Sequence, residues 1–125
     1  MIRVGRGDVV LIAFPFVTEG YVERKRRPAA VVQADRYNRR RTAVIIAAIT
    51  STRAHDELPC KVLVTKDSPA GVQANLRLDS IVDCQTLATV PRSEIVRRLG
   101  RFPPDVIQRI DQALQDALGL SGPGV

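Results

Sequence analysis

Residue types that carry much of protein chemistry are scarce in this sequence. Its 125 residues include no tryptophan and one histidine, His55. A single histidine excludes a histidine-rich metal site and a catalytic pair of histidines. The two cysteines, Cys60 and Cys84, lie outside any CxxC pattern, and we expect both to be reduced and packed in the core. The sequence therefore predicts neither a metal site nor a bound cofactor.

Long apolar segments are also missing. The longest uninterrupted apolar run covers residues 43–49, whereas a membrane-spanning helix needs about 20 apolar residues. The first residues are not followed by the apolar core of a secretory signal. We therefore predict a cytoplasmic protein without membrane contact. With 45% hydrophobic and 26% charged residues, the composition fits a single domain over residues 1–120 and a flexible tail over residues 121–125.

Aromatic side chains are few as well, which argues against a general platform for stacking single-stranded bases. Tyr37, beside Asn38, either stacks a nucleic-acid base or packs locally against the sheet. His55 lies in a polar loop, where a lone histidine either faces solvent or takes part in catalysis. The five aromatic residues are Phe14, Phe16, Tyr21, Tyr37 and Phe102.

Arginine, by contrast, is abundant and concentrated. Sixteen of the 19 basic residues are arginine, and the net charge is +6. Residues 21–41 hold eight basic and two acidic residues, so they carry the whole excess. Arginine stays charged at any working pH and its planar fork matches a phosphate group. This segment predicts either a site for a polyanion such as nucleic acid or a solvated face that meets an acidic protein.

Apolar patterning predicts a mainly β protein, in the α+β or small-barrel class, with one long helix at the end. We expect loops over residues 17–20 and 51–57, a turn over 66–71, and a turn or single helical turn over 35–39. Helical spacing of apolar residues from Val106 to Leu118, after Pro104 and before Gly119, predicts an amphipathic helix. This helix covers either one opening of a small barrel or an edge of the sheet. The expected strands are 8–14, 28–33, 42–50, 61–64, one within 79–90, and 95–101.

Two polar residues stand at the ends of neighbouring predicted strands. Arg27 lies at the start of the second strand and Thr50 at the end of the third. If these strands pair antiparallel, both residues lie at the same end of the sheet. The pair then either places a guanidinium group and a hydroxyl at one phosphate, or consists of a solvated arginine and an ordinary strand end.

Short motifs follow one another in a characteristic order over nearly the whole chain. In these motifs the sequence resembles the MazF/PemK family of toxin endoribonucleases from type II toxin–antitoxin systems. The motifs are Arg6-Gly7-Asp8-Val9-Val10-Leu11, Phe14-Pro15-Phe16, Arg26-Arg27-Pro28-Ala29-Ala30-Val31-Val32-Gln33, Tyr37-Asn38, Ala48-Ile49-Thr50-Ser51, Leu58-Pro59-Cys60, Asp79-Ser80-Ile81-Val82 and Arg98-Leu99-Gly100.

The resemblance implies a small SH3-like β-barrel of the PemK/CcdB type with a packed C-terminal helix, and a homodimer. It implies metal-independent cleavage of single-stranded RNA at short sequences, with 2′,3′-cyclic phosphate and 5′-hydroxyl ends. It places the catalytic roles on Arg27 and Thr50. It also implies a cognate acidic antitoxin that binds along the basic groove.

Chemistry gives these residues specific tasks. Arg27 is suited to stabilise the charge that develops on the phosphorane, and Thr50 to orient the attacking 2′-hydroxyl. We expect RNA contacts from Arg24, Lys25, Arg26, Ser51 and Gln85.

Gln85 marks a departure from some relatives, which place a carboxylate at about this position and use it as the general base. A glutamine takes no proton, so Gln85 either reads a base edge or is a surface amide, and the general base is not identified. Asp83 lies nearby, on the same face as Gln85 if the strand alternates regularly. Two other functions share this fold or charge pattern: a non-catalytic toxin that inhibits a protein such as gyrase, and a nucleic-acid-binding module without turnover.

Overall fold

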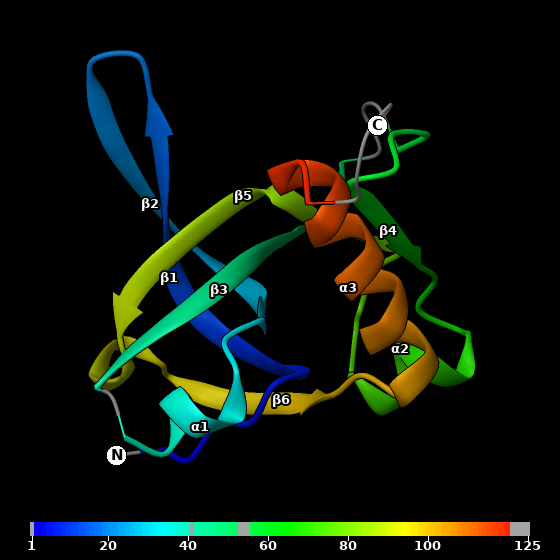
Figure 1. Cartoon of the computed structure of the whole chain (residues 1–125), viewed down its shortest axis with the longest axis horizontal. Helices are drawn as coiled ribbons and strands as arrows, with labels where there is room; N and C mark the ends of the chain where they lie inside the picture. The colour runs from blue at the N-terminus through cyan, green and yellow to red at the C-terminus, as the bar shows by residue number, and fades with distance from the viewer. Residues whose placement is uncertain (1, 41, 53–55, 121–125) are drawn as a thin grey trace.

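The computed structural model describes residues 2–40, 42–52 and 56–120. Within these ranges, six strands form one antiparallel sheet in the order β4-β5-β3-β2-β1-β6, so β4 and β6 are its open edges (Figure 1). The elements are β1 (Asp8–Thr18), β2 (Tyr21–Val31), α1 (Asp35–Asn38), β3 (Ala43–Thr50), β4 (Lys61–Val64), α2 (Pro69–Gln73), β5 (Ser80–Pro91), the 3-10 turn η1 (Arg92–Glu94), β6 (Arg97–Arg101) and α3 (Pro104–Leu118).

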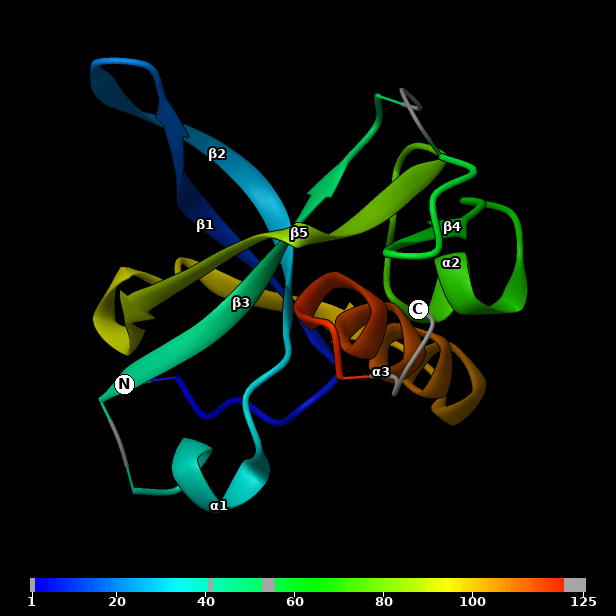
Figure 2. The same cartoon turned by 45° about the horizontal axis from the view of Figure 1, so that its top comes forward.

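Strands β1 and β2 form a hairpin that is longer than the sequence predicted. β1 continues through Pro15, and the expected loop shrinks to Glu19 and Gly20. Pro15 is tolerated because this part of β1 pairs with β2 alone. Gly20 closes the turn with φ +91°, a conformation that favours glycine. The end of the hairpin projects from the body of the protein (Figures 1 and 2).

Strand β2 begins at Tyr21, seven residues before its predicted start at Pro28, whereas β3, β4, β5, β6 and α3 lie close to their predicted ranges. The predicted loop over 51–57 includes residues 53–55, which lie outside the described residues.

The turn predicted over residues 66–71 is present only over residues 66–68. That segment leads into the short helix α2. The Ser68 hydroxyl accepts a hydrogen bond from the Gly71 N–H at 3.0 Å, and Pro69 occupies the first turn. Both features are helix-start signals, but serine and proline are also common in turns, which is why the sequence predicted the turn to continue through residue 71.

Apolar side chains pack on both faces of the sheet. One cluster lies between the sheet and the helices, where Val106, Ile110 and Ala113 of α3 are buried. Helix α3 contacts β4 and β5, so it covers a face of the sheet near that end instead of an edge (Figure 2). The sheet curls around a second cluster, and β1 contacts β5 across two intervening strands. The second cluster consists of Val10, Ile12, Phe14, Ala29, Val31, Val44, Ile46, Ala48, Val90 and Ile95.

This architecture confirms the predicted mainly β fold with a C-terminal amphipathic helix. Where the resemblance implied a small SH3-like barrel, the six-stranded sheet is strongly curled and remains open between β4 and β6. Cys60 and Cys84 are free and buried, as expected. None of the helices in the described ranges is long and apolar enough to span a membrane.

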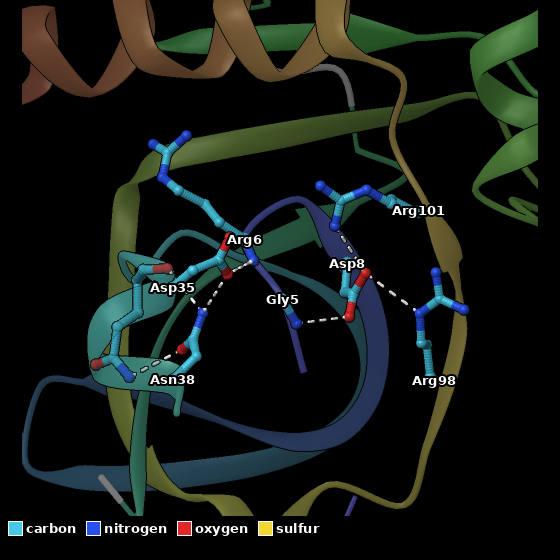
Figure 3. A network of polar contacts seen from close by, with 8 residues as sticks. Gly5, Arg6, Asp8, Asp35, Asn38, Arg98 and Arg101 are labelled. Carbon is cyan, nitrogen blue, oxygen red and sulfur yellow. Dashed lines mark hydrogen bonds and ion pairs between the residues drawn. The ribbon is translucent and has the colours of Figure 1, made fainter. Parts of the chain in front are cut away.

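A polar network fastens the N-terminal segment to the rest of the fold (Figure 3). The buried carboxylate of Asp8 accepts a hydrogen bond from the Gly5 N–H at 2.7 Å and contacts Arg98 and Arg101 of β6, each at 3.2 Å. A second carboxylate, that of Asp35, accepts hydrogen bonds from the backbone N–H of Arg6 and from the Asn38 amide. The hydrogen bond from Arg6 lowers the pKa of Asp35 below its ordinary value. The Arg6-Gly7-Asp8 motif therefore has a structural role.

Candidate active site

A cavity of about 280 Å³ lies where the interior of β2 and the end of β3 meet β6 and the segment that follows α2. Arg27 and Thr50, the two residues predicted to be catalytic, both line it, and so does Ser51. The complete lining is Leu11, Arg27, Pro28, Ile49, Thr50, Ser51, Asn75, Leu76, Arg77, Leu78, Ser80, Arg97 and Leu99.

Strand register explains why Arg27 and Thr50 meet. β2 and β3 pair antiparallel, which was the condition for this meeting in the sequence analysis, and Ala29 lies opposite Ala48. Continued by two residues, this register brings Arg27 level with Thr50. Both therefore reach the same end of the sheet, at the rim of the cavity.

The charged side chains that line the cavity are all arginines: Arg27, Arg77 and Arg97. No aspartate, glutamate, histidine or lysine is among the described lining residues. Some other arginines form ion pairs, as Arg98 and Arg101 do with Asp8. The three cavity arginines form no ion pair with any residue in the described ranges. The cavity thus holds three uncompensated positive charges and is suited to bind anions.

Sequence reasoning missed Arg77 and Arg97, because both belong to the part of the chain with no net charge. Arg97 lies opposite Leu11, and Leu11 lies opposite Pro28. This row of cross-strand neighbours places Arg97 in the same cavity as Pro28, and Arg27, the residue before Pro28, also lines it. Of the sequence signals, only the adjacent Arg98-Leu99-Gly100 motif points to this region.

Arg77 is held in place by close packing of the segment before it. A Cβ atom built on Gly100 would lie 2.5 Å from the backbone oxygen of Gln73 and 2.9 Å from the Cα of Ala74. Only glycine allows β6 and the end of α2 to approach so closely. The chain then turns at Asn75, which has φ +59°. Hydrogen bonds within the segment, among them Leu76 N–H to the Gly71 carbonyl at 2.9 Å, fix its path toward Arg77.

The Thr50 hydroxyl has a defined hydrogen-bonding state. Its oxygen accepts a hydrogen bond from the Thr52 N–H at 3.1 Å. One lone pair is therefore occupied, and the hydroxyl proton remains available for donation to a bound group. Thr50 is consequently better suited to donate to a phosphate oxygen than to remove a proton.

Comparison with known proteins settles the family. A sequence model described as "PemK-like, MazF-like toxin of type II toxin-antitoxin system" matches residues 5–118. The chain belongs to this family. It is 35% identical to endoribonuclease MazF6 of Mycobacterium tuberculosis over 97 residues, which cover 77% of this chain and 81% of that one. These matches confirm the predicted family of toxin endoribonucleases.

Two further relatives cover almost the whole chain. The probable endoribonuclease MazF of Mycolicibacterium smegmatis is 27% identical over 94% of this chain and 98% of its own. The solved structure of a mycobacterial endoribonuclease in complex with its cognate antitoxin is 26% identical, covers 96% of this chain and 99% of that one, and superimposes with a TM-score of 0.72.

The basic segment predicted as one unit is divided in space. Arg24, Lys25 and Arg26 lie on β2 within the hairpin and do not line the cavity. Arg24 contacts Glu94 and Lys25 contacts Glu23, both at 3.6 Å. The arginines at 36, 39 and 40 lie on and after α1, away from the hairpin tip (Figures 1 and 2). The RNA contacts predicted for Arg24, Lys25 and Arg26 therefore lie outside the cavity.

Gln85 lies on a bulge, which corrects the expected alternation along this strand. In β3, Ala47 and Ala48 are consecutive, but their partners in β5, Leu87 and Asp83, are four positions apart. The residues between Asp83 and Leu87 therefore have no partner in β3. Gln85 is exposed and is not among the residues that line the cavity. Its predicted contact with RNA is therefore separate from the cavity.

Asp83 stabilises the bulge. Its carboxylate accepts hydrogen bonds from the Gln85 N–H and the Thr86 hydroxyl, both at 3.0 Å, and contacts the Lys61 ammonium at 3.7 Å. Because these partners occupy both oxygens, and because Asp83 does not line the cavity, it is not positioned as the missing general base.

Two remaining candidates lie away from the cavity or outside the described residues. His55 belongs to residues 53–55, which the description does not cover. Tyr37 is 42% exposed, and the Arg36 guanidinium lies 4.8 Å from its ring centroid. This contact occupies one face of the ring. Across the described ranges, no group of three or more His, Cys, Asp or Glu side chains could hold a metal ion.

Proposed function

We propose that the cavity binds single-stranded RNA and cleaves it next to Arg27 and Thr50. The observation that supports this is the presence of three uncompensated guanidinium groups and the hydroxyls of Thr50 and Ser51 around one space of about 280 Å³. Guanidinium forks and hydroxyl donors are the groups that hold a phosphodiester and stabilise added charge on it. Membership in a toxin endoribonuclease family agrees with this chemistry.

The proposed reaction needs no cofactor. The 2′-oxygen of one ribose attacks the adjacent phosphorus, and its proton passes to hydroxide or water. The bond from phosphorus to the 5′-oxygen breaks, and that oxygen takes a proton from solvent. The products are a 2′,3′-cyclic phosphate and a 5′-hydroxyl. The phosphorane between them carries one more negative charge than the diester, and the cavity supplies the opposing positive charge.

Each residue has a distinct part in this reaction. Arg27 binds the non-bridging oxygens and stabilises their growing charge. Thr50 donates its hydroxyl proton to the phosphate, because the Thr52 N–H already occupies its oxygen. No lining side chain among the described residues is a general base near neutral pH, so positioning and electrostatics account for catalysis.

Cleavage is tested directly by incubating the protein with a pool of single-stranded RNAs in excess EDTA and mapping the fragment ends. We expect 5′-hydroxyl ends, and loss of at least about 10²-fold in rate for Arg27→Gln. Arg40→Gln is the matched control, because it removes the same charge from an exposed site outside the cavity. Binding without cleavage would indicate a nucleic-acid-binding module, and absence of both would indicate a non-catalytic toxin.

The predicted partners belong to this proposal. A related structure contains a cognate antitoxin, and the exposed arginines of this chain fit an acidic, extended antitoxin segment that folds on binding. A homodimer and a cytoplasmic location are proposed with it. Sedimentation of the protein alone and with the co-expressed antitoxin measures both assemblies.

A further inference from the structure

We infer that Arg77 and Arg97 bind the RNA phosphates that flank the scissile phosphate, so that the enzyme holds at least two consecutive phosphates in one cavity. This inference rests on the proposed function, because it takes Arg27 and Thr50 as the site of cleavage. It extends that function by naming two RNA-binding residues outside the basic segment.

Charge is the first argument. A phosphodiester carries one negative charge and the phosphorane carries two, so Arg27 alone does not match the transition state. Three uncompensated arginines exceed what one diester neutralises. The surplus matches additional diesters of the same strand. An isolated cavity with three uncompensated cations is costly, since the like charges repel one another when no anion is bound.

Position is the second argument. Arg97 on β6 and Pro28 on β2 lie on either side of Leu11 in one cross-strand row. Adjacent strands are about 4.8 Å apart, so the two backbones are separated by about 10 Å. Arg27 immediately precedes Pro28 along β2 and lines the same cavity as Thr50. The positive charge therefore extends across the sheet, over a greater length than one phosphate group.

The setting of Arg77 is the third argument. The left-handed backbone of Asn75 and the close contact of Gly100 with Ala74 bring this arginine to the cavity. Asp79, two residues later, accepts a hydrogen bond from the Lys66 N–H at 2.9 Å and does not line the cavity. The nearest carboxylate in sequence thus does not enter the cavity, and the Arg77 charge remains available to the ligand.

The test uses the full chain and a single-stranded RNA pool in which every 2′-hydroxyl is replaced by 2′-O-methyl. This pool is not cleavable, so binding is measured independently of catalysis. Affinity is measured from low to high salt for the wild type, Arg77→Gln, Arg97→Gln and the double variant. Each single variant is expected to reduce the slope of log affinity against log salt by about 0.7, and the double variant by about 1.4.

Two controls make the result specific. Arg40→Gln removes an equal charge outside the cavity and is expected to leave the slope unchanged. Arg97→Lys retains the charge and is expected to keep the wild-type slope while weakening affinity, because the bidentate fork is lost. Thermal unfolding of each variant verifies that the fold is intact.

The outcomes separate this inference from the proposed function. Unchanged slopes in Arg77→Gln and Arg97→Gln would overturn the inference, even if the wild type cleaves unmodified RNA and Arg27→Gln does not. Reduced slopes in both variants would support the binding of RNA phosphates by Arg77 and Arg97. The cleavage assay with Arg27→Gln decides separately whether the bound strand is cut at Arg27 and Thr50.

Discussion

Gly100 of β6 lies directly against Ala74 at the end of α2, with so little space that a Cβ atom on Gly100 would come within 2.9 Å of the Ala74 Cα. This contact is distant in sequence from the predicted catalytic residues. It nevertheless decides where the segment from Asn75 to Ser80 lies, and that segment forms one wall of the cavity. The arrangement of the cavity thus depends on a residue that has no side chain.

Gly100→Ala is therefore expected to weaken both stability and RNA binding. The added methyl group must displace backbone atoms of Gln73 and Ala74, which costs about 1–3 kcal/mol in overpacking. Urea unfolding measures the first effect, and RNA affinity the second.

Gly119→Ala is the control for this substitution. Gly119 has φ +69°, with no atom within 4 Å of its Cβ position, at the C-terminal end of α3. This substitution is expected to cost about 1 kcal/mol through backbone strain and to leave RNA affinity unchanged. Equal loss of affinity in both variants would refute the proposed role of Gly100.

Thr50 offers a test of hydroxyl chemistry. Thr50→Val keeps the shape of the side chain but removes the proposed donor to phosphate, so kcat is expected to fall by about 10²-fold. Thr50→Ser keeps the hydroxyl and is expected to retain most of the activity. Single-turnover cleavage of RNA measures both. Equal rates for the valine and serine variants would show that the hydroxyl does not act in the reaction.

The pH dependence of cleavage follows from the lining residues. None of the described residues that line the cavity is a histidine, cysteine, aspartate, glutamate, lysine or tyrosine. If hydroxide removes the 2′-proton, the rate rises steadily from about pH 6 to about pH 9. If the rate of the wild type instead reaches a plateau with rising pH, and the His55→Ala variant shows no plateau, His55 would be assigned as the general base.

The two buried cysteines predict a loss of stability in alkaline solution. Burial raises the pKa of Cys84 to about 12 and also raises the pKa of Cys60, in each case reinforced by the Asp83 carboxylate. Unfolded thiols release protons above about pH 9, whereas the native thiols retain them. Loss of these protons favours the unfolded state. The contribution of the two thiols to the free energy of unfolding is therefore complete below about pH 9 and is lost between about pH 9 and about pH 12.

Urea unfolding at neutral and alkaline pH measures this loss. The double variant Cys60→Ala and Cys84→Ala is less stable at every pH because it leaves cavities. Between neutral and alkaline pH, the free energy of unfolding of this double variant is expected to decrease less than that of the wild type. An equal decrease in both proteins would mean that the thiols do not contribute. Thiol-reactive probes are expected to modify the cysteines only after unfolding.

Much of the fold was predictable because it depends on local pattern. The apolar run before Thr50 and the helical spacing after Pro104 identified β3 and α3 correctly. The length of the β1–β2 hairpin was not predictable, since Pro15 is a common strand terminator and is tolerated here only because one neighbouring strand is absent. The bulge after Asp83 was not predictable either, because a bulge is defined by the pairing of β5 with β3, which the sequence of β5 alone does not give.

By itself, the sequence determined the apolar runs that form β2 and β3. It brought Arg27 to Thr50 only on the condition that these two strands pair antiparallel, and the structure meets that condition. Tertiary structure alone decided which charges surround that pair. It separated the arginines of α1 from those of the hairpin, and it added Arg77 and Arg97 from a part of the chain whose net charge is zero. The physical reason is that electrostatic interaction depends on distance through space, whereas a charge count along the sequence records only distance along the chain.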